Sequence, residues 1–425
     1  MGRFLISTLA EAGHVHPAVP VAAALTARGH EVLWHTGAEF AATVERAGAH
    51  FVLPRHTPTL AELPVTPDPG TSGAAAGASL LRRLLVERMA GQLADYEEIL
   101  AAEDVDGVLV DLCCLGGLAL HERRGTPWAT LGISPLTITS PDTPPFGTGW
   151  KPPAGPLGRA RNRIVHRLGR IAMRSVTVAY ADQRAALGLA PLARGVALFD
   201  HMFSPMLHLQ AATPSIEYPR RSWPANVHLV GPLLPEPPAA ADLPPWWGEL
   251  DTAPAVVHVT QGTFATDPAT LIDPALDALA RFDGLVVVTT PDPAALAPVP
   301  ANTRVARFVP HSLLLPHVDA MVTNGGYNGA KAALACGVPL VLAPWGNDQM
   351  DVAARVEWAG AGINLREAGP APEAIAGAVR AVLGEPGYLR AARRVQAEFR
   401  EYGGGERAAV LLERLTATSG VVSGR

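Results

Sequence analysis

A chain of 425 residues is long enough for two or three domains, and two domains of about 200 residues could each bury a full core. A formal net charge of −5, with no long run of Lys or Arg, argues against nucleic acid as the main partner. Three cysteines without metal-ligand spacing exclude a disulfide framework or a zinc knuckle as the organising feature, and no apolar stretch of about 18 residues predicts a membrane span.

The first half of the chain has the order strand, loop, helix, strand that opens a parallel α/β sheet. A glycine-containing loop over residues 10–16 follows the first strand, and Pro17 is expected to start a helix over residues 18–28. The predicted strands cover residues 3–9, 31–35 and 107–110. Arginines are densest between Arg159 and Arg174, and their helical spacing indicates a solvated helix face rather than a membrane or nucleic-acid patch.

Residues 233–251 contain five prolines and the pair Trp246-Trp247, which is typical of a linker. The α/β pattern then restarts, with predicted strands at residues 255–260, 284–289 and 320–323 and a helix at 268–282. We therefore expect an N-terminal domain over residues 1–232, a linker over 233–251 and a second α/β domain over 252–400. Residues 401–425 are expected to form a helix that packs back on the N-terminal domain and a frayed tail.

A glycine-rich segment follows the strand that ends at Thr323 and precedes the next helix. Glycines in such a place let backbone N–H groups approach a phosphate, and the helix N-terminus adds partial positive charge. Lys331 is the only basic side chain there, so the backbone would provide most of the anion binding. Asp348 and Gln349 follow the next strand, at its carboxyl end, where they suit sugar hydroxyls.

These pieces resemble the donor-binding signature of the inverting family 1 glycosyltransferases, which have the GT-B fold of two Rossmann-like α/β domains facing each other across a cleft. The family includes bacterial natural-product and macrolide enzymes that use UDP- or TDP-sugars. The resemblance covers nearly the whole chain. The matching segments are Phe308-Val309-Pro310-His311, Asn324-Gly325-Gly326, Gly337-Val338-Pro339 and Asp348-Gln349.

The resemblance implies a role for each matching position. Phe308 would stack on the pyrimidine base, with Val309 and His311 beside it, and Asn324 would face the diphosphate. Asp348 and Gln349 would bind donor-sugar hydroxyls. The remaining phosphate contacts would come from Thr263, Gly325, Gly326, Asn328 and Gly329.

Four positions depart from the family pattern. Asn324 and Phe308 replace the usual His and Trp, and His311 replaces the usual Gln. Ala332 stands where many UDP-sugar enzymes have a Glu that binds ribose. These departures leave the choice between UDP and TDP, and the identity of the sugar, open.

The segment Gly13-His14-Val15-His16-Pro17 resembles the family's Gly-His-Val-Asn-Pro turn. By that resemblance His14 is the general base that takes the acceptor proton, and Asp111 is the carboxylate that orients its imidazole. His16 could share or tune this role. Acceptor contacts are expected from residues 57–92 and 134–150. Their apolar side chains suit a lipophilic small molecule. The candidates for acceptor binding are Met89, Phe146 and Trp150, together with His16 of the preceding turn.

The resemblance implies a single inverting displacement without a metal or a resident cofactor, in which the nucleotide sugar is a co-substrate. Asp104-Val105-Asp106 precedes its strand and is interpreted as a solvated turn, not a metal site. The expected partners are the donor and a small-molecule acceptor, with no nucleic acid and no stable membrane insertion. A cytoplasmic location is expected, because the first residues lack a signal-peptide pattern. The sequence leaves open whether the protein is a monomer or a homodimer.

Other functions are less well supported by the sequence. One is a catalytically silent protein that binds sugar nucleotides. Another is a GT-B-fold epimerase or retaining transferase, which usually needs a Glu pair and more basic side chains than the segment from Asn324 to Gln349 offers. A dinucleotide-dependent oxidoreductase is disfavoured because the first loop lacks the Gly-X-Gly-X-X-Gly pattern.

Overall fold

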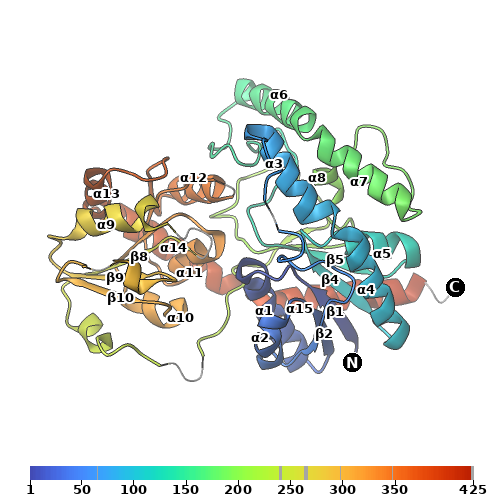
Figure 1. Cartoon of the computed structure of the whole chain (residues 1–425), viewed down its shortest axis with the longest axis horizontal. Helices are drawn as coiled ribbons and strands as arrows, with labels where there is room; N and C mark the ends of the chain where they lie inside the picture. Colours follow the sequence, from blue (N-terminus) through green and yellow to red (C-terminus); the bar gives the residue numbers. More distant parts are fainter. Residues whose placement is uncertain (65, 239–241, 263–266, 297, 347, 423–425) are drawn as a thin grey trace.

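Two parallel β-sheets, one in each half of the chain, form the framework of the protein (Figure 1). The computed structural model describes residues 1–422 apart from 65, 239–241, 263–266, 297 and 347, with side chains described up to residue 417. The strand order is β3-β2-β1-β4-β5-β6-β7 in the first sheet and β10-β9-β8-β11-β12-β13 in the second. Neighbouring strands are parallel, which is the α/β class predicted from the sequence.

The strands are short, and β4 and β5 are buried along their whole length, as in sheets that are covered on both faces. Those of the first sheet are β1 (Arg3–Ser7), β2 (Glu31–His35), β3 (His50–Val52), β4 (Gly107–Asp111), β5 (Trp128–Gly132), β6 (His208–Gln210) and β7 (Val227–Leu229). Those of the second are β8 (Val256–Thr260), β9 (Leu285–Thr289), β10 (Thr303–Ala306), β11 (Ala320–Thr323), β12 (Leu340–Leu342) and β13 (Gly362–Asn364).

Helices surround both sheets (Figure 1). In the N-terminal half they are α1 (Ala12–Ala27), α2 (Ala41–Arg46), α3 (Gly73–Leu81), α4 (Met89–Ala102), α5 (Gly116–Arg124), α6 (Pro156–Ala172), α7 (Arg174–Ala186) and α8 (Leu198–His201). In the C-terminal half they are α9 (Ile272–Leu279), α10 (His311–Leu314), α11 (Tyr327–Ala335), α12 (Gln349–Ala359), α13 (Pro372–Gly384), α14 (Pro386–Tyr402) and α15 (Gly404–Val422). Among the described helices, none is both long and apolar enough to cross a membrane.

Each sheet reverses its strand order at one point, between β1 and β4 in the first sheet and between β8 and β11 in the second. Open α/β sheets bind ligands in the crevice outside the carboxyl ends of the strands at such a point. In the first sheet, β1 leads into α1 and β4 ends at Asp111. In the second sheet, β11 ends directly before Asn324. The fold therefore places the candidate residues of both halves at equivalent edges.

Helix α1 begins at Ala12, so the prediction that Pro17 starts this helix was wrong. The segment expected to be a loop forms the first turns of the helix, and Pro17 lies inside it. A proline near the helix N-terminus is tolerated, but it has no N–H to donate to the carbonyl four residues earlier. The carbonyl of Gly13 is thereby left available for a partner outside the helix.

The end of the chain returns to the N-terminal half after Gly403, where α14 gives way to α15. Ala408 and Leu412 of α15 are buried in the same core as α1, which α15 crosses in Figure 1. The Glu413 carboxylate pairs with Arg28 at 2.7 Å. At the other end of the predicted linker, Leu250 packs into the core of the C-terminal sheet. The two halves are thus connected by α15 as well as by the chain between β7 and β8.

Candidate active site

A cleft of about 2690 Å³ lies between the carboxyl ends of the two sheets. Its lining combines α1 of the N-terminal half with α11 and the start of α12 of the C-terminal half; His14, Asn328 and Asp348 are among the lining residues. Most small-molecule pockets enclose roughly 300–1,000 Å³, so this cleft has room for two substrates together.

His14 and Asp111 meet at the N-terminal wall of the cleft. His14 Nδ1 lies 3.1 Å from Asp111 Oδ2, and Asp111 is buried while His14 remains partly exposed. The carboxylate is fixed by backbone N–H groups, since Leu9 donates to Oδ2 at 2.7 Å and Cys113 donates to Oδ1 at 2.6 Å. The contact assigns a proton to Nδ1 and leaves Nε2 as the basic nitrogen. The pair has the geometry of a general base and the group that orients it.

Cys113 brings a third potential ligand atom close to this pair. One atom each of His14, Asp111 and Cys113 lie within 4.8 Å of one another, a spacing that could hold a metal ion. Loss of solvent, followed by the charge of Asp111, raises the pKa of the Cys113 thiol well above its usual value. A thiol with a raised pKa is a poor metal ligand because the thiolate is the ligating form. The chemistry of this donor set therefore favours a His–Asp pair with a neutral thiol beside it.

The N-terminus of α11 forms part of the C-terminal wall of the cleft. Gly326 is the N-cap, and Gly326, Asn328 and Gly329 line the cleft. The first N–H groups of a helix have no intrahelical partner and form an anion site. Gly325 adopts φ +88° and packs against Gln349 instead of lining the cleft.

Lys331 is buried over the Tyr327 ring, its Nζ 4.0 Å from the ring centre, and burial lowers its pKa to about 7.

Two asparagines of this segment use their side chains for contacts within the protein. Asn324 Nδ2 donates to the carbonyl of Gln261, and Asn324 Oδ1 accepts from the Gly326 N–H at 3.3 Å. Asn328 Nδ2 donates at 3.0 Å to the carbonyl of Gly13, the group that Pro17 leaves unpaired in α1. Asn324 therefore holds the loops after β8 and β11 together, and Asn328 links the two halves beside His14. Thr263 lies outside the described residues.

The predicted base site has one exposed aromatic ring. Phe308 is 73% exposed and lines the cleft, as a stacking platform for a base requires. The Val309 side chain is instead buried in the hydrophobic core, so only its backbone is available to a ligand. His311 is the first residue of α10 and also lines the cleft, and burial lowers its pKa, which favours the neutral imidazole.

Asp348 and Gln349 lie at the N-terminus of α12 and line the cleft. Burial raises the pKa of the Asp348 carboxyl to about 6. The Gln349 side chain is oriented because its Oε1 accepts from the Trp345 N–H at 3.2 Å, which leaves the amide nitrogen to donate. One acceptor and one donor thus stand side by side.

The acceptor candidates divide into two groups. His16 and Phe146 line the cleft, and burial lowers the pKa of His16. Met89 was a wrong prediction, because it is fully buried in the N-terminal core at the start of α4. Trp150 was also wrong as a lining residue of the cleft: Arg161 lies 4.2 Å over its ring, outside the main cleft. Apolar side chains of the cleft that were not singled out from the sequence are Leu60, Leu80, Leu81, Leu84 and Leu85.

Asp351, in the first turn of α12, ties the loop after β5 to the C-terminal half. Its carboxylate accepts from the backbone N–H groups of Gly147 at 2.6 Å and Gly149 at 3.1 Å. Both glycines have positive φ, of 79° and 60°, which lets two N–H groups of one loop converge on a single carboxylate. Phe146 precedes this anchor directly. Asp348, which is predicted to bind the donor sugar, therefore shares a helical turn with the residue that anchors a loop predicted to contact the acceptor.

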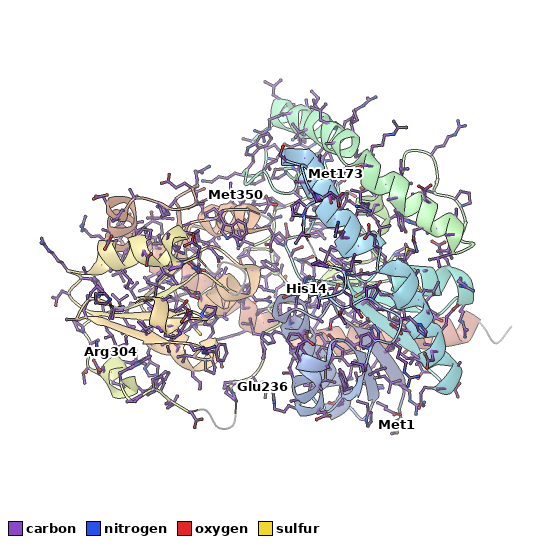
Figure 2. The ribbon with its side chains drawn as sticks, in the orientation of Figure 1. Met1, His14, Met173, Glu236, Arg304 and Met350 are labelled. Carbon is purple, nitrogen blue, oxygen red and sulfur yellow. The ribbon has the colours of Figure 1, made fainter. Side chains whose placement is uncertain are left out.

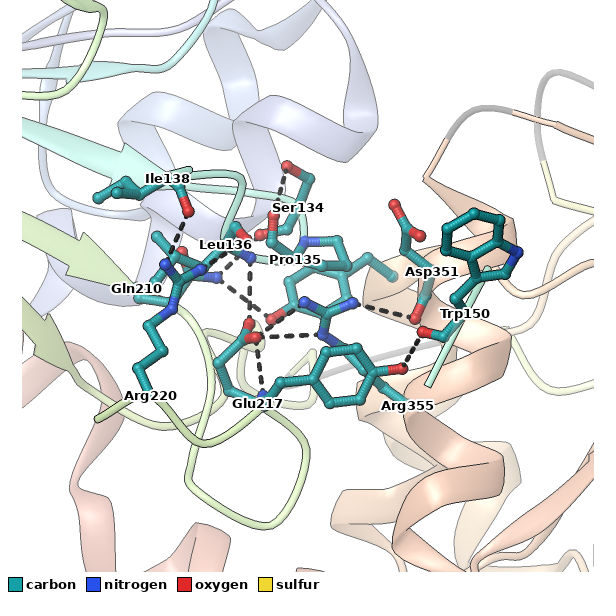
Figure 3. A network of polar contacts seen from close by, with 12 residues as sticks. Ser134, Pro135, Leu136, Ile138, Trp150, Gln210, Glu217, Arg220, Asp351 and Arg355 are labelled. Atoms are coloured by element: carbon teal, nitrogen blue, oxygen red, sulfur yellow. Dashed lines mark hydrogen bonds and ion pairs between the residues drawn. The ribbon is translucent and has the colours of Figure 1, made fainter. Parts of the chain in front are cut away.

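A buried ion pair lies behind this anchor. Arg355 Nη2 is 2.8 Å from Glu217 Oε1, and the other oxygen of Glu217 accepts from the Leu136 N–H at 3.0 Å (Figure 3). Tyr218 carries the same network to the loop after β5, since its hydroxyl donates to the Trp150 carbonyl at 3.0 Å. Removing one partner of such a pair leaves a buried unpaired charge. The network therefore fixes how the two halves face each other.

None of these interdomain residues was predicted from the sequence. Glu217 and Arg355 are 138 positions apart, and Asp351 is 202 positions from Gly149. A signal in the sequence was the pair Asp351 and Arg355, four residues apart in a mostly apolar stretch, because charges on a helix that becomes buried need partners.

Two facing parallel-sheet domains, with the candidate residues at the carboxyl ends of both sheets, define the GT-B class of glycosyltransferases. The chain is 22% identical to the crystal structure of the glycotransferase of kitacinnamycin, with a TM-score of 0.76 over 97% of this chain and 98% of that one. The spinosyn rhamnosyltransferase SpnG complexed with thymidine diphosphate has a TM-score of 0.69 at 24% identity, covering 98% of this chain and 100% of that one. Both likenesses concern the fold.

Sequence relatives identify the family. The chain is 42% identical to 4'-demethylrebeccamycin synthase of Lentzea aerocolonigenes over 93% of this chain and 95% of that protein. It is 31% identical to UDP-glycosyltransferase 2 of Phaeomoniella chlamydospora over 91% of this chain and 90% of that protein. Residues 273–402 match the family described as erythromycin biosynthesis protein CIII-like, C-terminal domain. The chain belongs to the GT-B glycosyltransferases of the natural-product type, the family that its motifs predicted.

The Asp351 anchor predicts the effect of a near-isosteric change. In Asp351→Asn the charge is lost and the amide nitrogen cannot accept, so one of the two loop N–H groups loses its partner. We expect this contact to stabilise the loop by about 1–3 kcal/mol less, because a buried donor is left unsatisfied. Hydrogen exchange at the Gly147 and Gly149 amides should accelerate, and the KM for the acceptor should rise while the affinity for the donor stays unchanged.

Asp142→Asn is the matched control, because Asp142 lies in the same loop but accepts from Arg221 within the N-terminal half. Its exchange at residues 147–149 should match that of the wild type. Unchanged exchange in Asp351→Asn would show that the loop is held by other contacts.

Proposed function

We propose that this glycosyltransferase transfers a hexose or deoxyhexose from a UDP- or TDP-sugar to a hydroxyl group of a small lipophilic molecule. The transfer inverts the anomeric centre and uses His14 as the general base without a metal ion. The observation that carries the proposal is the 3.1 Å contact between His14 and Asp111 in the same cleft that the N-terminus of α11 faces.

The reaction is a single displacement. His14 Nε2 takes the proton of the acceptor hydroxyl as its oxygen bonds to the anomeric carbon, and the bond from that carbon to the diphosphate oxygen breaks. Asp111 stabilises the imidazolium that forms, since its carboxylate is already fixed by two backbone N–H groups. The backbone N–H groups at the start of α11 would donate hydrogen bonds to the leaving diphosphate and so stabilise the negative charge that develops on it.

The lining of the donor side favours a thymidine nucleotide. Ala332 lines the cleft with a methyl group, where the family pattern has a Glu that binds ribose. Ala332 itself offers no acceptor to a ribose 2′-hydroxyl, a group that deoxyribose lacks. Two structural neighbours, VinC and SpnG, are solved with thymidine diphosphate, which agrees with this preference.

The acceptor side favours an apolar molecule. Leucines of α3 and the segment after it, together with the half-exposed Phe146, line this part of the cleft. A flat aromatic or polyketide-like molecule would bury apolar surface against these side chains, whereas a polysaccharide would leave the side chains exposed to water. The relative 4'-demethylrebeccamycin synthase, by its name, makes a small natural product, which is consistent with this class of acceptor.

Replacement of His14 by alanine tests the catalytic role. We expect kcat to fall by roughly 10²- to 10⁴-fold, the usual contribution of a positioned general base. The dissociation constant for a TDP-sugar should stay nearly unchanged, because the donor contacts lie on the C-terminal wall. Single-turnover kinetics and calorimetry measure the two quantities separately.

His16→Ala is the matched control, since His16 lies on the same helix and lines the same cleft but is not the partner of Asp111. Its kcat should remain within a few-fold of that of the wild type. A His14→Ala enzyme with wild-type kcat would contradict the proposed base.

The raised pKa of Asp348 predicts a pH dependence of donor binding. Because the carboxyl titrates near pH 6, it is ionised at about pH 7.5 and mostly protonated at about pH 5.5. A carboxylate that accepts from sugar hydroxyls loses this ability when it takes up a proton, so affinity should fall roughly fourfold over this interval. Calorimetric titration of a nucleotide sugar into the wild type and into Asp348→Asn measures the effect. The variant should bind weakly at both pH values, and an equal pH dependence in both proteins would assign the titration to another group.

A further inference from the structure

Helix α6 carries an apolar stripe that faces away from the protein. Its four members lie seven, four and three residues apart, which places them on one side of a helix. They are Leu157, Ile164, Leu168 and Ile171, with exposed fractions of 87%, 60%, 57% and 63%. The opposite side faces the protein, where Asn162 is buried and His166 contacts the carbonyls of Ser140 and Thr143. We call these four residues the α6 stripe.

Positive charge borders the α6 stripe. Residues 156–174 contain six arginines and no Asp or Glu, although the whole chain has a net charge of −5. Arg170 pairs with Asp200 at 2.6 Å and Arg161 lies over Trp150. Among the described residues, no ion pair is formed by Arg159, Arg163 or Arg167. On the helix, Arg163 and Arg167 stand next to the stripe on one flank. The sequence alone had indicated a solvated face, but it did not show that large apolar side chains share that exposure.

We infer that the outer face of α6 binds an anionic lipid surface peripherally. A helix that combines an exposed apolar stripe with an arginine-rich flank lies in the interface of a bilayer, with its apolar side among the acyl chains and its charges at the headgroups. Helix α6 is a single helix at the periphery of the N-terminal half (Figures 1 and 2), and the α6 stripe lies on its exposed side. A second copy of this chain would bring arginines against arginines, whereas anionic headgroups complement them.

The same helix also reaches the cleft. His166, Gly169 and Met173, from the inner side of α6 and just beyond its end, line the cleft that His14 lines from the other side. A lipid-bound α6 would therefore hold the acceptor side of the cleft close to the membrane surface, where a lipophilic acceptor is concentrated. Lipid binding by α6 does not depend on the donor site or on His14, so it extends the proposed function without resting on it.

Cosedimentation of the full chain with vesicles tests this surface. The protein should sediment with vesicles of phosphatidylcholine containing phosphatidylglycerol, bind phosphatidylcholine alone more weakly, and be released by salt. Arg163→Gln with Arg167→Gln should lower the partition coefficient roughly 25-fold, because each basic residue near an anionic surface contributes about fivefold. Ile164→Glu with Leu168→Glu should abolish binding, since the apolar contact is replaced by like charge.

The controls are Arg393→Gln with Arg394→Gln and Leu389→Glu, which change exposed residues of α14 in the C-terminal half. These variants should bind vesicles like the wild type, and all variants should keep the melting temperature and the turnover of a water-soluble acceptor. The inference is overturned if the wild type fails to bind the anionic vesicles at low salt, or if the α6 variants bind as well as the controls. The inference is also overturned if vesicle binding is absent and the Ile164 and Leu168 changes instead dissociate a dimer of this chain or release an acidic protein partner.

Discussion

The contact between the Asp111 carboxylate and His14 Nδ1 is the interaction on which the proposed catalytic arrangement depends. It exists because β1 and β4 are neighbouring parallel strands, so the residues that follow their carboxyl ends meet at one edge. Backbone N–H groups of Leu9 and Cys113 hold the carboxylate, and the first turns of α1 hold the imidazole. Folding of the sheet therefore places the proposed base and its carboxylate together before any substrate arrives, which is the condition for general-base catalysis without reorganisation.

The same helical turn also connects the two halves. Pro17 cannot donate to the Gly13 carbonyl, and Asn328 of α11 donates to it instead. Gly13, beside the proposed base His14, is thereby bonded to the helix whose N-terminus faces the proposed diphosphate site. Asp351 and Arg355 make the equivalent link from α12 to the loops of the N-terminal half. Desolvating such charges is costly, and they stabilise the arrangement only because each has several partners. These polar contacts are among those that hold the two walls of the cleft together.

Sequence reasoning was most successful where function requires particular residues in a short segment. The glycine-rich turn, the Asp348-Gln349 pair and the Gly13–Pro17 segment each lie within a few residues of sequence, and their resemblance to one family predicted the class of enzyme, which the relatives confirm. The roles of the individual residues stay predictions. It failed where burial decides. Met89 is apolar and falls in an expected acceptor segment, yet it serves the core, because composition does not show which side of a helix faces the cleft. The interdomain contacts escaped prediction because their partners are more than a hundred residues apart.

The most direct test of the account is a thermal-shift measurement with UDP- and TDP-sugars in the presence of a metal chelator. A ligand that binds the folded cleft raises the melting temperature by mass action. We expect a TDP-sugar to raise the melting temperature with the chelator present. His14→Ala should show the same rise in melting temperature, although its rate of sugar transfer is greatly reduced. If no nucleotide sugar in the panel shifts the melting temperature, or if the shift requires a divalent ion, the account is contradicted.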